Sequence, residues 1–160
     1  MNLIENKERI FSQVAQAMET ANRTDQVNVI AVTKYVGIDQ AKALVDTGVC
    51  HIGENRVDKF LEKYQALKDE GLTWHLIGSL QRRKVKEVIN YVDYFHALDS
   101  MKLAQEIQKR ASHPIKCFIQ VNISGEESKH GFAPEELDAV LPELEGLDNL
   151  QIVGLMTMAP

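Results

Sequence analysis

The chain has 160 residues, 44% of them hydrophobic, which is enough to bury the core of one domain. Its formal net charge of −5 argues against a dedicated nucleic-acid binder, because such proteins are usually basic. It contains no run of about 18 apolar residues, so no membrane-spanning helix is expected.

Strand-like and helix-like segments alternate along the chain. Helical spacing of apolar residues is found at residues 3–21, 38–45, 57–67, 85–89, 100–107 and 134–144. Apolar, strand-like runs are found at residues 27–34, 49–53, 73–78, 91–98, 115–123 and 150–156. Ser100 is expected to cap the fifth helix, and Pro134 suits the first turn of the sixth.

This order indicates parallel strands with helical crossovers, and the near-continuous apolar strands fit a sheet that is covered on both sides. An open doubly wound sheet and a (β/α) barrel compete as architectures. No glycine-rich nucleotide motif follows a strand, whereas polar residues follow several different strands, as a barrel's carboxyl face requires. The expected fold is therefore α/β, a (β/α)8 TIM-type barrel with only about six of its eight strands, and residues 1–160 form one incomplete domain.

The two cysteines and the N-terminal residues indicate in which cellular compartment the protein is found. Cys50 and Cys117 lie far apart in strand-like apolar segments, and residues 1–7 lack the basic and apolar regions of a signal peptide. Two buried thiols without a disulfide framework are typical of a reducing environment. The expected location is the cytoplasm.

Lys34 ends the apolar, β-branched run at residues 27–34, which indicates a buried strand. Burial disfavours the charged form of an amine, so a lysine placed there is expected to be partly neutral and nucleophilic toward a carbonyl group. The alternative is a lysine that marks where the strand reaches solvent.

Other chemistries have less support. The five histidines show no HxH or HExxH spacing, so no metal site is expected, and His75 and His96 could face inward from neighbouring strands as core residues. No GxSxG motif surrounds a serine. The basic run at residues 81–86 is interpreted as a solvated helix face, with nucleic-acid binding and an anion contact at the helix start as alternatives.

Five segments resemble one known family in the same order along the chain. They are AVTK at residues 31–34, GENRV at residues 53–57, HLIGSLQRRK at residues 75–84, QVNIS at residues 120–124 with Glu127, Lys129 and Gly131, and GLMTMAP at residues 154–160. The family is the pyridoxal phosphate homeostasis proteins, related in fold to the N-terminal barrel of alanine racemase. Arg82 and Arg83 depart from the family, in which many members carry a serine–asparagine pair.

The resemblance implies that Lys34 holds pyridoxal 5′-phosphate (PLP) as an internal aldimine, with no catalytic residue of its own. It also implies that Asn55, His75 and Met156 line the cofactor pocket, with His75 packing or hydrogen bonding near the ring. For each of these three residues an alternative stays open: Glu54 and Asn55 as caps of the next helix, His75 as a core histidine, and Met156 as core filling.

Two classes of function follow from this resemblance. The first is a protein of PLP and vitamin B6 homeostasis that catalyses no reaction, with PLP-dependent apo-enzymes as partners and without nucleic acid or membrane partners. The second is an amino-acid racemase, which needs two opposed bases; Tyr35 is next to Lys34, but neighbouring strand residues face opposite ways, so the carrier is favoured. A lysine aldolase is a weaker third possibility. Family members continue into two further strands whose loops are expected to hold the phosphate, so this chain is expected to bind PLP more weakly than an extended version.

Overall fold

The computed structural model of the chain describes residues 2–126 and 130–159, so Glu127, Lys129 and Pro160 lie outside the described residues. Within them, one sheet contains six parallel strands in the order β1-β2-β3-β4-β5-β6. The strands are β1 (Ala31–Val32), β2 (His51–Glu54), β3 (Thr73–Leu76), β4 (Tyr94–Leu98), β5 (Ile115–Gln120) and β6 (Leu150–Met156).

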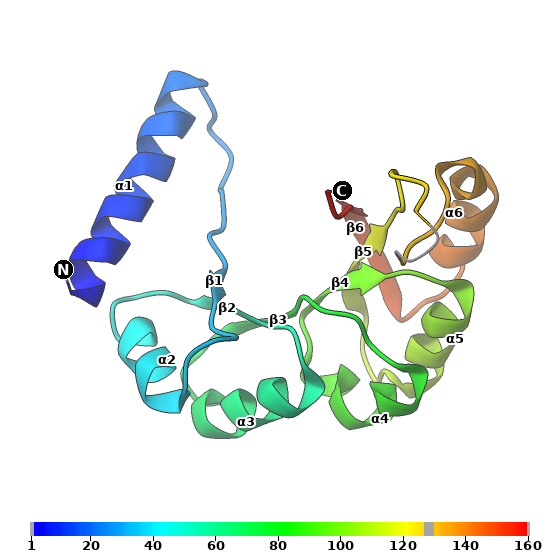
Figure 1. Ribbon diagram of the computed structural model, residues 1–160, viewed down its shortest axis with the longest axis horizontal. Helices are drawn as coiled ribbons and strands as arrows, with labels where there is room; N and C mark the ends of the chain where they lie inside the picture. The colour runs from blue at the N-terminus through cyan, green and yellow to red at the C-terminus, as the bar shows by residue number, and fades with distance from the viewer. Residues whose placement is uncertain (1, 127–129, 160) are drawn as a thin grey trace.

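The helices are α1 (Leu3–Thr20), α2 (Ile38–Val45), α3 (Val57–Leu67), α4 (Val85–Val88), α5 (Met101–Arg110) and α6 (Leu137–Glu145), with short 3-10 turns at Arg82–Lys84, Ile89–Tyr91 and Pro134–Glu136. Helices α2 to α6 connect successive strands along the outer side of the sheet, whereas α1 precedes β1 and stands away from the sheet (Figure 1). The Ser100 hydroxyl accepts a hydrogen bond from the Leu103 amide at 3.1 Å, which confirms the predicted cap of α5. Pro134 opens the turn that leads into α6, also as predicted.

The strand order confirms barrel-type winding. In a doubly wound sheet the strand order reverses at a switch point, whereas here every strand pairs with the next one along the chain. Among the described strands, β1 and β6 each have a neighbour on one side only, so the sheet is an open, curved arc (Figure 1). The carboxyl ends of all six strands lie along one edge of this arc, where a barrel of this type places its site.

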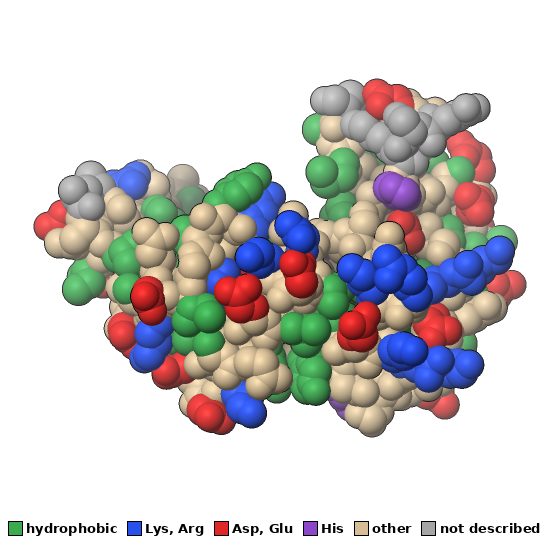
Figure 2. Space-filling view, turned by 60° about the horizontal axis from the view of Figure 1, so that its bottom comes forward, with side chains coloured by type: hydrophobic (Ala, Val, Ile, Leu, Met, Phe, Trp, Pro, Cys, Tyr) green, Lys and Arg blue, Asp and Glu red, His purple; other side chains and the backbone are tan. Residues whose placement is uncertain are grey.

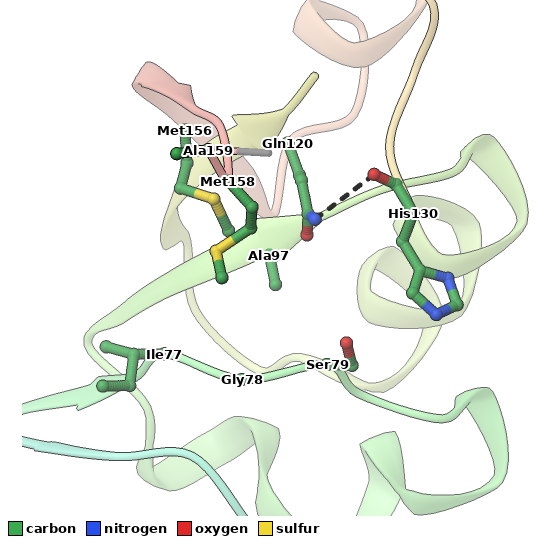
Figure 3. A pocket seen from close by; sticks show the side chains of 9 residues that line it. All are labelled: Ile77, Gly78, Ser79, Ala97, Gln120, His130, Met156, Met158 and Ala159. Atoms are coloured by element: carbon green, nitrogen blue, oxygen red, sulfur yellow. Dashed lines mark hydrogen bonds between the residues drawn. The ribbon is translucent and has the colours of Figure 1, made fainter. Parts of the chain in front are cut away.

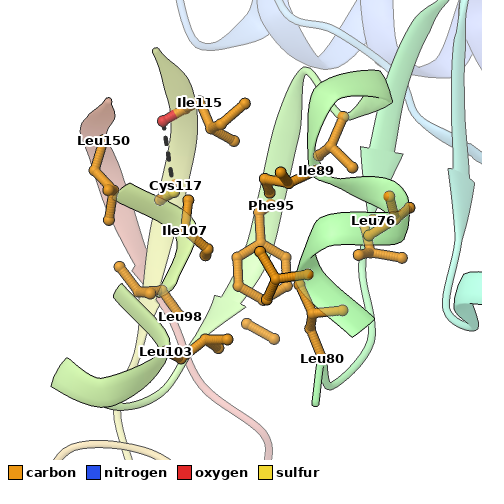
Figure 4. Packing of buried hydrophobic residues seen from close by; sticks show 14 of the residues in the cluster. Leu76, Leu80, Ile89, Phe95, Leu98, Leu103, Ile107, Ile115, Cys117 and Leu150 are labelled. Atoms are coloured by element: carbon orange, nitrogen blue, oxygen red, sulfur yellow. Dashed lines mark hydrogen bonds between the residues drawn. The ribbon is translucent and has the colours of Figure 1, made fainter. Parts of the chain in front are cut away.

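The apolar core lies between the outer face of the sheet and helices α3, α4 and α5 (Figure 4). Phe95 on β4 is fully buried there, together with Leu76 on β3 and Ile107 on α5. Burial of each such side chain contributes about 1.5–3 kcal/mol, so this layer fixes the strand ends that carry polar groups.

The first strand is shorter than predicted. The sequence indicated a buried strand over residues 27–34, but only Ala31 and Val32 pair with β2. The reason is that β2 begins at His51, which lies opposite the position just before Ala31, so the preceding residues find no backbone partner. Val32 is 52% exposed, and the prediction of a buried first strand is therefore wrong.

Cover of the sheet also differs from the prediction. The outer face is covered by helices, but Val32 on the inner face of β1 is open, because β1 is an edge strand among the described elements. Helix α1 buries none of its residues, and its apolar Ile4 is 62% exposed. Cys117 is buried as predicted and burial raises its pKa to about 12, but Cys50 is exposed, which corrects the expectation of two buried thiols.

No helix in the described part of the chain is both long enough and apolar enough to cross a membrane. On the helical face, Lys and Arg side chains lie among Asp and Glu side chains (Figure 2). Arg82 and Arg83 are exposed, and the pKa of Glu106 on α5 is lowered chiefly by its hydrogen bond with Arg110 and to the smallest extent by the charge of Arg82. The basic run is thus part of a mixed-charge, solvated surface, although it forms short turns rather than the expected single helix.

Candidate functional site

Lys34 lies in the tight turn that follows β1. The turn is closed by a hydrogen bond from the Val36 amide to the Thr33 carbonyl oxygen at 3.2 Å. Lys34 is half-buried, and its ammonium lies 5.1 Å from the ring centroid of Tyr35 in a cation–π contact. Both residues are in a turn, so the alternation of side chains along a strand does not apply to them. The prediction that Tyr35 faces away from Lys34 is therefore wrong.

A buried ion pair lies behind this turn. Lys63 of α3 places its ammonium 2.7 Å from Glu54 Oε2, and the two side chains are 2% and 0% exposed. The same ammonium donates to the Thr33 carbonyl oxygen at 3.0 Å, and the Thr33 hydroxyl donates to Glu54 Oε2. Glu54 therefore does not cap α3, whose N-cap residue, Arg56, makes no side-chain cap bond; the alternative reading of Glu54 as a cap is wrong.

Asn55 follows β2 and packs tightly against the loop after β3. A Cβ atom added to Gly78 would lie 2.2 Å from the Asn55 carbonyl oxygen, so only glycine permits this approach. Asn55 and Ser79 together line a polar cleft of about 380 Å³ that also contains Gln81 and Lys84. The geometry joins the ends of β2 and β3 into one rigid corner of the carboxyl edge.

A second cleft, of about 320 Å³, lies at the carboxyl ends of β3 to β6 (Figure 3). Met156 and Met158 lie on one side of it, facing Ile77 and Ser79 on the other. Its polar groups are those of Ser79, Gln120 and His130, and Gln120 donates to the His130 carbonyl oxygen at 3.3 Å. Ser79 lines both clefts, so they adjoin along the same edge. The volume is that of a small-molecule site.

His75 lies one strand layer below this edge, in a row of three histidines. Its Nε2 is 3.0 Å from His51 Nδ1, and its Nδ1 is 2.9 Å from His96 Nε2. The His75 ring stacks on Tyr94 with centroids 4.6 Å apart. Burial, together with the neighbouring His96 and His51, lowers the pKa of His75 to about 3, so the ring is neutral at pH 7. Both ring nitrogens are engaged, which leaves packing as the contact His75 offers to a ligand.

The structure brings some of the predicted residues together and separates others. Lys34, Asn55 and Met156 all lie on the carboxyl edge, but of the three only Met156 lines the cleft shown in Figure 3, Asn55 lines the adjoining one, and Lys34 lines neither of the two. The inward orientation of His75 and His96 is confirmed by their hydrogen bond. Sequence reasoning missed Lys63 and the inward role of Gln120; the single signal for Lys63 was a charged residue on the apolar face of a helix.

The site belongs to a recognisable class. Residues 6–160 match the family described as Alanine racemase, N-terminal domain, which is a barrel-type α/β family. The chain is 39% identical to the Pyridoxal phosphate homeostasis protein of Aquifex aeolicus (strain VF5), over 100% of this chain and 72% of that protein. It is 31% identical to the protein of the same name from Pseudomonas aeruginosa, over 98% of this chain and 70% of that protein. The chain therefore belongs to the pyridoxal phosphate homeostasis protein family.

Solved structures agree with this assignment. PipY of Synechococcus elongatus PCC7942, solved with PLP bound, is 30% identical and superposes with a TM-score of 0.82 over 99% of this chain and 71% of PipY. Alanine racemase of Clostridium difficile 630 is 19% identical, with a TM-score of 0.67 over 84% of this chain and 37% of the racemase, which shows a shared fold. The chain thus spans about 70% of the length of its nearer relatives.

Proposed function

We propose that this protein binds PLP through Lys34 and serves in intracellular PLP homeostasis. The observation that carries the proposal is the position of Lys34, a primary amine in the turn after β1, on the same sheet edge as the two clefts. Relatives named for PLP homeostasis, and PipY with PLP bound, support the choice of ligand. When bound, PLP supplies an aldehyde that condenses with a primary amine with loss of one water.

The residues along this edge fit such a group. Lys34 makes a cation–π contact with Tyr35 and has no carboxylate within ion-pair distance among the described residues, so no ion pair holds its side chain away from a ligand. Met156 supplies apolar packing in the cleft at the ends of β3 to β6, and Asn55 supplies an amide in the adjoining one. His75 supports the site from below as a neutral ring, by packing.

We favour a carrier without a catalysed reaction over a racemase. Racemisation needs two bases on opposite faces of the substrate carbon. Tyr35 does not meet that need, because its ring lies beneath the Lys34 ammonium and its side chain comes from the same turn. A carrier that sequesters a reactive aldehyde needs the lysine alone. Its partners are PLP and PLP-dependent apo-enzymes in the cytoplasm, and residues 1–160 act as one domain built on a single continuous sheet.

The test is a visible-absorbance titration of the purified protein with PLP. Wild type is expected to develop an absorbance band distinct from that of free PLP, and Lys34→Ala is expected to lose it. Lys116→Ala is the matched control, because Lys116 is another lysine of the sheet whose ammonium lies over an aromatic ring, that of Tyr94. A band that survives Lys34→Ala would contradict the proposal. Exchange of the α-proton of alanine into deuterated water, if catalysed, would favour the racemase.

A further inference from the structure

The turn that carries Lys34 has little support from the sheet. Strand β1 pairs at two positions, Ala31 with Ile52 and Val32 with Gly53, and has no neighbour on its other side among the described strands. The residue after Lys34, Tyr35, is 89% exposed and packs on no core residue. Beyond the Thr33 amide, which donates to the Gly53 carbonyl oxygen at 3.0 Å, neither strand pairing nor apolar packing accounts for how this turn is held.

The ion pair between Lys63 and Glu54 supplies that support. Lys63 and the Val36 amide both donate to the Thr33 carbonyl oxygen, so one ammonium holds the acceptor that closes the turn. Glu54 accepts from the Thr33 hydroxyl, so the pair holds Thr33 by its backbone and by its side chain. These bonds link three elements, namely the end of β1, the end of β2 and helix α3.

Stability alone does not account for a pair of this kind. Apolar residues of similar size often replace a buried ion pair without loss of stability, because the charges must be taken out of water. Apolar residues could not bond to a carbonyl oxygen and a hydroxyl. Here the pair is almost fully buried. One carboxylate oxygen, Glu54 Oε1, has no hydrogen-bond partner, whereas Glu54 Oε2 binds both Lys63 and Thr33. The carboxylate is therefore placed for its contact with Thr33 and not for the largest number of hydrogen bonds.

We propose that Lys63 and Glu54 are positioning residues, which act through Thr33 to fix the turn from which Lys34 reaches its ligand. The inference rests on the proposed function for its effect on PLP binding. The rigidity of the turn, in contrast, can be measured in the protein without ligand. The pair lies on the helical side of the sheet, beneath α3, and acts without touching the ligand.

The first test uses the protein without PLP. Nuclear magnetic resonance relaxation gives order parameters for the amides of Lys34, Tyr35 and Val36. In wild type they are expected near the rigid value of about 0.85, and in Lys63→Met and Thr33→Val they are expected to fall below about 0.6. Thr33→Ser keeps the hydroxyl and should retain wild-type values. Lys59→Met is the matched control, because Lys59 lies on the same helix in an exposed pair with Glu62.

The second test measures PLP affinity at a temperature at which each variant is folded. Thr33→Val is expected to weaken binding about tenfold, because a turn that is no longer held must be ordered when PLP binds, and Thr33→Ser is expected to restore it. If Lys63→Met does not fold, Thr33→Val decides the question, since it removes one hydroxyl without exposing a charge. Order parameters that stay at the Lys59→Met values would overturn the inference. Binding that persists in Lys34→Ala would instead overturn the proposed function and leave the order parameters unaffected.

Discussion

Lys63 and Glu54 form an ion pair at 2.7 Å in which both side chains are almost completely excluded from solvent. The pair joins helix α3 to the end of β2 and contacts Thr33, the residue before Lys34. An uncompensated charge in this position is costly, because the carboxylate would lose its partner and gain no water.

Lys63→Met is therefore expected to lower the free energy of unfolding by about 3–5 kcal/mol, measured by urea denaturation. Lys59→Met on the exposed side of α3 should change it by no more than about 0.5 kcal/mol. The double variant Glu54→Leu/Lys63→Met should recover most of the loss, because no charge is left unpaired. Equal costs for the two single lysine variants would show that the buried pair is not formed in solution.

The histidine row predicts how stability depends on pH. The pKa of His75 is about 3 in the folded protein and about 6.5 in the unfolded chain, so between these values the unfolded chain binds the additional proton. The contribution of His75 to the free energy of unfolding is fully present above about pH 6.5 and is lost progressively as the pH falls toward 3. The pKa values of His51 and His96 are lowered in the same direction, chiefly by burial.

Unfolding free energies measured by urea denaturation from pH 7.5 down to pH 4.5 should therefore fall steadily below about pH 6.5. The ring of His75, followed by nuclear magnetic resonance, should stay neutral through this range. A His75 ring that titrates near 6.5 would mean that the row of three histidines does not exist in solution.

Gly78→Ala tests the close approach of the loops after β2 and β3. The new Cβ would lie 2.2 Å from the Asn55 carbonyl oxygen, so the loop must move, and we expect a loss of about 1–3 kcal/mol in unfolding free energy. Gly146→Ala is the control, since its Cβ would have no neighbour nearer than 3.4 Å and its φ is −75°. That variant should be neutral or gain about 0.4–1 kcal/mol. A tolerated Gly78→Ala would refute the packing of Asn55.

Met156→Ala tests whether Met156 contacts the ligand or only fills the core. Met156 is half-buried at the end of β6, and its truncation removes apolar surface from the wall of the cleft at the ends of β3 to β6. PLP affinity is expected to fall about fivefold, the equivalent of losing about 1 kcal/mol of apolar contact. Val153→Ala, an exposed change on the same strand outside the cleft, should leave affinity unchanged. An unchanged affinity in Met156→Ala would place the ligand elsewhere.

The order of the elements was predictable because each helix and strand carries its own periodicity. The six strands, the cap at Ser100, the place of Pro134 in the first turn of the last helical segment and the barrel-type winding follow from local patterns. The extent of the first strand was not predictable, since a strand requires a partner and β2 begins only at His51. An apolar run such as residues 27–34 shows what could be buried but not what is available to bury it.

The candidate site was likewise predictable only in part. Lys34, Asn55 and Met156 were predicted from the motifs, and the structure puts all three on one edge, while their contact with a ligand stays a prediction. Lys63 was not found, because its partner Glu54 is nine residues away on a different element and no local pattern links them. The histidine row was found in part, since strand alternation predicts facing but not hydrogen-bond contact.

The proposed bond between Lys34 and PLP can be located directly. The protein is mixed with PLP, the bond is made permanent by reduction with borohydride, and the modified peptide is mapped by mass spectrometry. We expect a single phosphopyridoxyl group on Lys34 and none in Lys34→Ala. Modification concentrated on another lysine, or spread equally over the surface lysines, would contradict it.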